Sequence, residues 1–311
     1  MANYLVTGGA GFVGSHLCRR LLEEGHAVRV LDDLSSGRQD NLAEIAAAVD
    51  FRQGDLRDPD ILDATVRDID FILHHAAVAS VQTSVERPLF EQDVNAVGTL
   101  RLLEAARQAG VKRLVFAASA AAYGNNPANP KGEEMVPEPC SPYGISKVCG
   151  EYYCRVYSQL YGLETVALRY FNIFGPRQDP ASPYSGVISI FVNCMEQGQR
   201  PVVFGDGLQE RDFVYVDNVV EANILACQID QAAGEIYNIG CGQGISIAAL
   251  VEHINQINGT SIGPQYAAER PGDVRLSLAD ISRARAVLGY EPVVPFELGL
   301  ERTVEWMQSQ R

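Results

Sequence analysis

The sequence is short of positive charge. In 311 residues, 25 Lys and Arg residues stand against 39 Asp and Glu residues, which gives a formal net charge of −14. This deficit argues against a function that depends on wrapping nucleic acid or coating an anionic membrane. An anionic ligand must therefore be met by a few locally placed arginines or by helix N-termini.

Other features that the sequence lacks indicate the cellular compartment and the partners of the protein. The seven cysteines are an odd number and form no Cys-x-x-Cys pair, so we expect reduced, buried thiols rather than a disulfide framework. No run of 18 apolar residues occurs, and no basic region precedes the first apolar segment at Tyr4. We therefore predict a cytoplasmic protein with no membrane or nucleic-acid partner. His74 and His75 are adjacent but have no suitably spaced third ligand, so no metal site is predicted.

The first 170 residues alternate short β-branched runs with longer helical patterns, which is typical of βαβ units and a parallel sheet. The predicted strands cover residues 4–7, 27–32, 50–53, 71–74, 113–118 and 165–169. The predicted helices cover residues 12–24, 59–66, 89–109 and 142–161. This order predicts an α/β fold with a Rossmann-type, doubly wound parallel sheet.

After residue 169 the composition changes, and Gly and Pro become frequent between residues 172 and 186. We predict that residues 1–171 form the dinucleotide-binding domain and that 213–240 return to it, with a further buried strand at 213–216. Residues 172–212 and 241–311 are predicted to form a smaller C-terminal domain that binds the substrate.

The strongest local signal is a glycine-rich run, Thr7-Gly8-Gly9-Ala10-Gly11-Phe12-Val13-Gly14, between a predicted strand and helix. Such glycines permit a tight turn and let a pyrophosphate approach the helix N-terminus, although the run alone could be a simple turn. Asp32 ends the second strand 18 residues after Gly14, close to the spacing of ~20 expected for a carboxylate on the adenosine ribose. An acid there favours NAD over NADP, whereas Arg38 follows a Ser-Ser-Gly turn and is expected to be solvated. The predicted NAD ligands from this region are Gly8, Gly11, Phe12, Val13, Gly14 and Asp32.

A second signal is the pair Tyr143 and Lys147, which follows Ser141-Pro142. Serine before proline is a good helix start, so the pair should lie one turn apart on one helix face. Ser119 ends the fifth predicted strand, where doubly wound sheets place ligands. A tyrosine titrates near 10, and a base at pH 7 would require lowering that pKa by ~3 units, or ~4 kcal/mol. Lys147 and a positively charged nicotinamide could provide this, with Ser119 relaying the proton.

Together these motifs resemble the extended short-chain dehydrogenases/reductases, in the nucleotide-sugar epimerase branch. Further matching runs lie at Asp55-Leu56, His75-Ala76-Ala77, Asn95, Ser119 to Gly124, Arg169 to Asn172, Arg211 to Val214 and Arg270 to Asp273. The resemblance covers nearly the whole chain. It implies NAD as the cofactor, a UDP-sugar as the substrate, and a homodimer formed through a four-helix contact between residues 89–109 and 142–161 of two subunits.

The resemblance also implies roles for single residues. On the cofactor side, Asp55 and Leu56 would border the adenine, Asn95 and Tyr170 would lie near the nicotinamide half, and Ala76 and Ala117 would touch the cofactor. On the substrate side, Asn172 would contact the diphosphate, Arg211 and Arg270 would clamp it, and Asp273 would hold the uridine ribose. Ala117 departs from several family members, which carry a serine there.

Ala120 and Ala121 exclude two related reactions. Similar sugar 4,6-dehydratases carry an Asp-Glu pair at these positions, and UDP-glucuronate decarboxylases carry a Glu at the second. Alanine cannot act as an acid or a base, so 4-epimerisation without elimination remains.

Ser277 bears on the choice of sugar. Epimerases restricted to UDP-glucose and UDP-galactose have a bulky tyrosine at this position, whereas a small side chain leaves room for an N-acetyl group on C2. The prediction is a UDP-N-acetylglucosamine (UDP-GlcNAc) 4-epimerase similar to those of bacterial polysaccharide pathways. A UDP-glucose or UDP-glucuronate 4-epimerase remains an alternative, and a catalytically silent NAD-binding sensor is a more distant one.

Overall fold

A computed structural model describes residues 1–179, 186–269 and 274–310. Its main feature is a seven-stranded parallel sheet in the order β10-β6-β5-β4-β1-β2-β3. The strands are β1 (Asn3–Thr7), β2 (Ala27–Asp32), β3 (Val49–Gln53), β4 (Phe71–His74), β5 (Arg113–Ser119), β6 (Glu164–Tyr170) and β10 (Ile236–Ile239). The chain winds outward from β1 in both directions, and this confirms the predicted Rossmann-type α/β fold.

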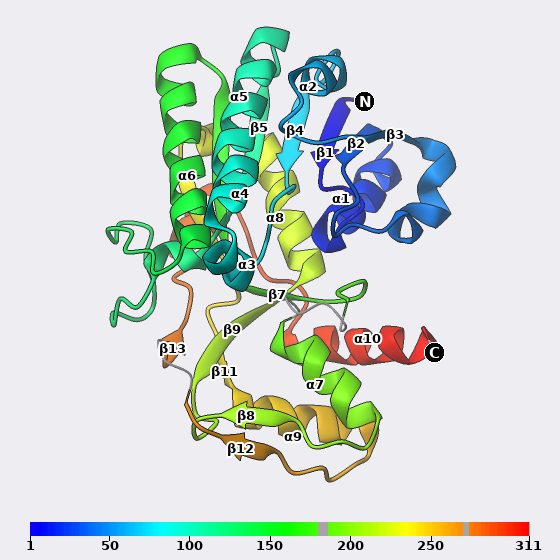
Figure 1. Cartoon of the computed structure of the whole chain (residues 1–311), viewed down its shortest axis with the longest axis vertical. Coiled ribbons are helices and arrows are strands. Elements are labelled where there is room, and N and C mark those ends of the chain that lie inside the picture. The colour runs from blue at the N-terminus through cyan, green and yellow to red at the C-terminus, as the bar shows by residue number, and fades with distance from the viewer. Residues whose placement is uncertain (180–185, 270–273, 311) are drawn as a thin grey trace.

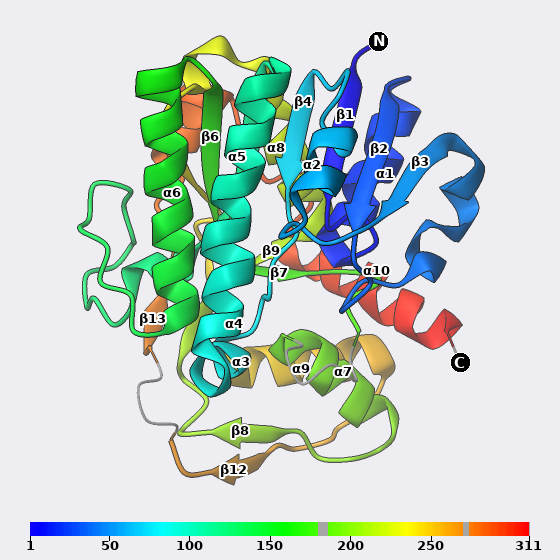
Figure 2. The ribbon, with the colours of Figure 1, turned by 45° about the horizontal axis from the view of Figure 1, so that its top comes forward.

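Helices cover both faces of this sheet (Figures 1 and 2). One face carries α2 (Pro59–Thr65), α5 (Gly98–Ala109) and α6 (Pro142–Tyr161), whose apolar side chains form one core with the sheet. The other face carries α1 (Phe12–Glu23) and α8 (Val216–Gln228), which form a second core. A parallel sheet buried on both faces explains why its strands read as apolar runs rather than alternating ones.

The predicted helix at residues 89–109 is interrupted in the structure. After the short α3 (Val81–Glu86), the chain forms α4 (Pro88–Gln92), a π-helical turn η2 (Asp93–Val97) and then α5. Within the wider turn, Asn95 is buried, accepts a hydrogen bond from the Val78 N–H at 2.8 Å and donates one to the Val78 carbonyl at 3.1 Å. This tertiary contact accounts for the interruption, because a π-bulge re-aims a side chain that a regular helix would direct elsewhere.

A smaller sheet lies beyond the carboxyl ends of the seven parallel strands (Figure 1). Its central strand is β9 (Glu210–Tyr215). It pairs with β7 (Asn172–Phe174), β11 (Gly244–Ser246) and β13 (Leu276–Ser277). A two-stranded sheet of β8 (Val202–Phe204) and β12 (Gln265–Ala267) lies nearby, with helices α7 (Val187–Glu196), α9 (Ile247–Asn258) and α10 (Phe296–Ser309) (Figure 1). The remaining short helical turns are η1 (Gln39–Ala48), η3 (Ala120–Tyr123), η4 (Asp230–Ala232) and η5 (Ala284–Leu288).

The strand expected at residues 213–216 is β9, and it pairs in the smaller sheet rather than in the large one. The chain then returns to the large sheet through α8 and β10. Within the described parts of the chain, no helix is both long and apolar enough to cross a membrane.

Candidate active site

Three of the predicted catalytic residues meet at the carboxyl end of β5. Ser119 is its last residue, and Tyr143 lies in the first turn of α6, where the Ser141 hydroxyl accepts the Gly144 N–H at 3.1 Å. Ser119 lies close enough to Tyr143 to lower the pKa of its phenol. Lys147, one turn further along α6, donates its Nζ proton to the Ala117 carbonyl at 2.8 Å and lies 5.7 Å from the centre of the Tyr143 ring. The N-cap and proline thus orient the first turn of α6 toward the end of β5.

The pKa of Tyr143 in this cluster is raised, whereas a catalytic base was expected to have a lowered pKa. Burial raises the pKa of Tyr143, the nearby Ser119 side chain lowers it, and the charge of Glu91 raises it again. Burial lowers the pKa of Lys147 to about 8, while the charges of Glu91 and Glu151 act in the opposite direction. The residues alone therefore favour a phenol beside an ammonium at pH 7. A further positive charge is needed to favour the phenolate.

The glycine-rich turn fits the phosphates of a dinucleotide. Gly8 has φ +70°, and a Cβ added there would lie 2.7 Å from the Ala76 backbone nitrogen. A Cβ at Gly14 would lie 2.2 Å from the Gly8 carbonyl oxygen. Helix α1 begins at Phe12, followed by Val13, and its N-cap residue Gly11 has no side chain that could bond the first N–H groups. A bare helix N-terminus beside a tight glycine turn is a ready site for pyrophosphate.

Asp32 lies where β2 ends, beside this turn. Its Oδ2 accepts the Ala10 N–H at 2.9 Å and its Oδ1 accepts the Leu34 N–H at 2.9 Å, while burial raises its pKa. The carboxylate, which was predicted to contact the adenosine ribose, thus also holds the backbone on both sides of the turn. Arg38 is exposed and lies 3.7 Å from Asp40.

The other predicted cofactor residues line the same edge of the sheet. Asp55 forms an ion pair with Arg57 at 2.6 Å, and hydrogen bonds from that guanidinium lower its pKa. Leu56 is buried. Tyr170 is buried, donates a hydrogen bond to Asn223 at 3.1 Å and is stacked on His75 with ring centres 5.8 Å apart.

The substrate-side predictions converge on the smaller sheet. In its register, Ser277 on β13 is paired with Arg211 on β9, and Asn172 on β7 is paired with Phe213. The Asn172 amide donates to the Asp212 carbonyl at 3.1 Å. These three predicted residues, far apart in sequence, are therefore held by one sheet. Arg270 and Asp273 lie outside the described residues.

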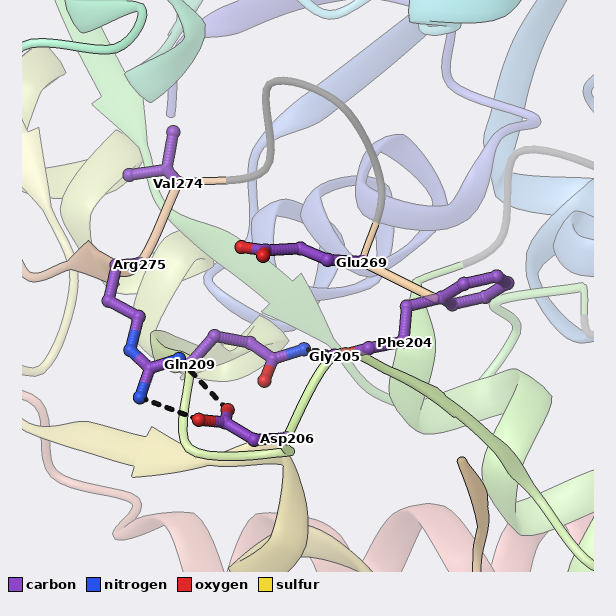
Figure 3. Close-up of a pocket in the computed structure, with 7 residues that line it drawn as sticks. All are labelled: Phe204, Gly205, Asp206, Gln209, Glu269, Val274 and Arg275. Atoms are coloured by element: carbon purple, nitrogen blue, oxygen red, sulfur yellow. Dashed lines mark hydrogen bonds and ion pairs between the residues drawn. The ribbon is translucent and has the colours of Figure 1, made fainter. Parts of the chain in front are cut away.

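A pocket that the sequence reasoning missed lies next to this sheet (Figure 3). It has a volume of about 140 Å³ and is lined by Phe204, Gly205, Asp206, Gln209, Glu269, Val274 and Arg275. The Arg211 guanidinium donates to the Val274 carbonyl at 2.6 Å, which joins the pocket to the sheet. Arg275 forms an ion pair with Asp206 at 2.9 Å. Within the described residues, Gln209 Oε1 is buried and has no hydrogen-bond partner. The glycines that flank Asp206 could have indicated a binding turn.

A second missed residue is Glu91, which is completely buried and hydrogen-bonded to Ser146 on α6. The part of the chain that the structure describes holds no cluster of three or more His, Cys, Asp or Glu residues that could bind a metal ion.

Known proteins resemble this chain in both sequence and structure. Residues 4–240 match the family model described as the NAD dependent epimerase/dehydratase family. The UDP-glucose 4-epimerase of Mycolicibacterium smegmatis is 42% identical over 310 residues, which cover 98% of both chains.

Two solved structures are similar over nearly their whole length. One is the UDP-N-acetylglucosamine 4-epimerase of Methanobrevibacter ruminantium in complex with UDP-N-acetylmuramic acid, with a TM-score of 0.95, 40% identity, and coverage of 100% of this chain and 99% of that one. The other is the UDP-glucose 4-epimerase of Thermus thermophilus in complex with NAD, with a TM-score of 0.90, 39% identity, and coverage of 99% and 100%. The chain therefore belongs to the NAD dependent epimerase/dehydratase family, and NAD is its cofactor.

Proposed function

We propose that this protein is an NAD-dependent UDP-hexose 4-epimerase that interconverts UDP-GlcNAc and UDP-N-acetylgalactosamine (UDP-GalNAc). The observation that carries the proposal is the cluster of Ser119, Tyr143 and Lys147 at the end of β5, in which Lys147 Nζ lies 5.7 Å from the centre of the Tyr143 ring. Ala120 and Ala121 follow Ser119, so no acid stands there to remove water or carbon dioxide. The similarity to a UDP-N-acetylglucosamine 4-epimerase and to UDP-glucose 4-epimerases supports the reaction class.

In this mechanism, bound NAD would supply the acceptor and then the donor of the hydride at C4 of the sugar. Tyr143 takes the proton of the 4-hydroxyl group, and Ser119 hydrogen-bonds the same oxygen. Lys147 supplies a positive charge that stabilises the phenolate. The 4-keto sugar then turns about its diphosphate linkage, and Tyr143 returns the proton when the opposite face has been presented. The residues that would hold NAD are the turn from Gly8 to Gly14 together with Asp32, Asp55, Leu56, Ala76, Asn95, Ala117, Tyr143, Lys147 and Tyr170.

The substrate would lie between the two sheets. Residues 1–171 with 216–240 would hold NAD, and residues 172–215 with 241–311 would hold the nucleotide sugar, because β9 belongs to the smaller sheet. Asn172 and Arg211 would contact the diphosphate together with Arg270, and Asp273 would contact the ribose. The pocket beside Phe204 suits a flat base, since it offers an aromatic ring and the unpartnered acceptor of Gln209, which could accept the ring N–H of uracil.

Parallel turnover measurements on UDP-GlcNAc, UDP-glucose and UDP-glucuronate test the choice of sugar. We expect the higher kcat/KM on UDP-GlcNAc, because Ser277 leaves space beside C2. The matched variant Ser277→Tyr should lose at least about tenfold on UDP-GlcNAc and much less on UDP-glucose, since overfilling a pocket by a ring costs more than ~1.4 kcal/mol. Equal or higher kcat/KM of the wild type on UDP-glucose would contradict the sugar assignment. Activity on UDP-glucuronate alone would favour a UDP-glucuronate 4-epimerase. No product from any of the three substrates would favour the NAD-binding sensor.

We also propose a homodimer formed through a four-helix contact. The predicted segments, residues 89–109 and 142–161, expose large apolar side chains that a monomer would leave in water, including Leu89 at 87%, Val156 at 40% and Leu160 at 71% exposure. Leu89→Asp should therefore shift the protein toward monomer in sedimentation at micromolar concentration. Val293→Asp, which changes an apolar residue that is 71% exposed outside these segments, should leave the dimer intact. A wild-type monomer at that concentration would contradict the dimer.

A further inference from the structure

Glu91 is a carboxylate with no exposed surface, and it lies on α4 beside the first turns of α6. Its Oε1 accepts the Ser146 hydroxyl at 2.6 Å and the side-chain amide of Asn95. Its Oε2 accepts the Gln92 amide at 2.8 Å. Three neutral donors, one each from α4, η2 and α6, thus fix both oxygens.

These contacts connect Glu91 to both sides of the candidate active site. Ser146 directly precedes Lys147 on α6, and Gln92 also donates to the Pro142 carbonyl at 2.8 Å, directly before Tyr143. On the other side, Asn95 is bonded to both backbone groups of Val78, in the loop that follows β4. Displacement of Glu91 would therefore loosen the turn that carries Tyr143 and Lys147.

The charge of Glu91 has no direct counter-ion. Among the residues that the structure describes, Glu91 forms no ion pair, and all of its hydrogen-bond donors are neutral. A buried carboxylate without a direct counter-ion is costly, and a nearby cation offsets part of that cost. Lys147 is such a cation, because Glu91 favours its charged form.

On the basis of the epimerase function proposed above, we propose that Glu91 is a positioning residue of the active site, whose carboxylate holds the first turns of α6 through Ser146 and serves as the counter-charge of the Lys147 ammonium. Glu91 touches neither the sugar nor the cofactor in this role, and it acts through Lys147 and Tyr143.

Among the groups that face Lys147, Glu91 contributes most to keeping the lysine charged. Glu151, on α6, also favours the charged lysine, but its carboxylate already pairs with Arg169 at 2.8 Å. From β4, burial lowers the pKa of His74 to about 3 and that of His75 to about 4, so both imidazoles are neutral at pH 7. Removing the Glu91 charge should therefore lower the pKa of Lys147. It should also lower that of Tyr143, since the two like charges no longer repel.

Direct titration of Lys147 tests the counter-charge. The chain has three lysines, Lys112, Lys131 and Lys147, so protein labelled with ε-¹³C lysine gives three assignable NMR signals. In the NAD-loaded Glu91→Gln variant, the Lys147 signal should titrate about one pH unit or more below that of the wild type. Glu301→Gln, which removes the same charge from the exposed face of α10, should leave the Lys147 titration unchanged.

The pH profile of turnover gives the second readout. Both limbs of the Glu91→Gln profile should move to lower pH by about one unit, whereas a purely structural loss would reduce turnover equally at all pH values. If Glu91→Gln does not fold, Glu91→Asp decides, because its shorter side chain carries the charge away from α6 and should give a smaller drop in the Lys147 pKa. An unchanged Lys147 titration in the variant that folds would overturn the role of Glu91. A wild type without epimerase activity would overturn the proposed function instead, and the NMR titration would still test the counter-charge.

Discussion

Replacing Tyr143 by Phe is expected to reduce 4-epimerase turnover by about a thousandfold or more while leaving NAD bound. The substitution removes a single oxygen and keeps the ring, so the packing of the first turn of α6 is retained. General acid–base catalysis by a placed side chain typically contributes about 10²–10⁴-fold. Turnover on UDP-GlcNAc, measured beside the NAD content of the purified protein, checks both halves of this expectation.

Tyr152→Phe is the matched control, since Tyr152 lies on the same helix but is 54% exposed. It should keep wild-type turnover. Near wild-type turnover of Tyr143→Phe would refute the role of Tyr143. Loss of NAD together with activity would instead show that the hydroxyl is needed to build the cofactor site.

The sequence was sufficient for most of the large sheet because the signals there are local. Apolar runs between helical patterns predicted six of the strands, and Ser141-Pro142 predicted the start of α6 at the residue where the structure begins it. The pairing of β9 could not be predicted, since a buried strand has the same composition in either sheet. The π-helical turn at Asp93–Val97 was also missed, because it depends on the contact between Asn95 and a loop 17 residues earlier in the chain.

The residues of the candidate site were likewise predictable only where a local sequence pattern marks them. Tyr143, Lys147 and the glycine turn carry recognisable spacing, and the structure brings Tyr143 and Lys147 together with Ser119. Glu91 carries no such signal, because a single glutamate in a helical pattern is usually a solvated residue. Its burial follows only from the packing of α4 against α6. The pocket at Gln209 likewise arises where segments more than 50 residues apart meet.

The buried ion pair between Arg169 and Glu151 predicts the largest effect on stability. Both side chains are only 2% exposed, and the guanidinium donates two hydrogen bonds of 2.8 Å to the carboxylate while lying over the Tyr123 ring at 4.7 Å. Arg169→Met should lower the free energy of unfolding by about 3–5 kcal/mol, because it leaves the charge of Glu151 buried and unpaired. Denaturant unfolding of the NAD-loaded protein measures this loss.

A double variant separates the cost of the unpaired charge from the value of the pair. Arg169→Met combined with Glu151→Leu should regain most of the lost stability, since an apolar pair of similar volume needs no counter-charge. Arg285→Met, which breaks the exposed pair with Glu291, should cost no more than about 1 kcal/mol. If Arg169→Met cost as little as Arg285→Met, water would have to reach Glu151 in the folded protein. In that case Glu151 could not favour the charged form of Lys147, which lies one turn earlier on α6.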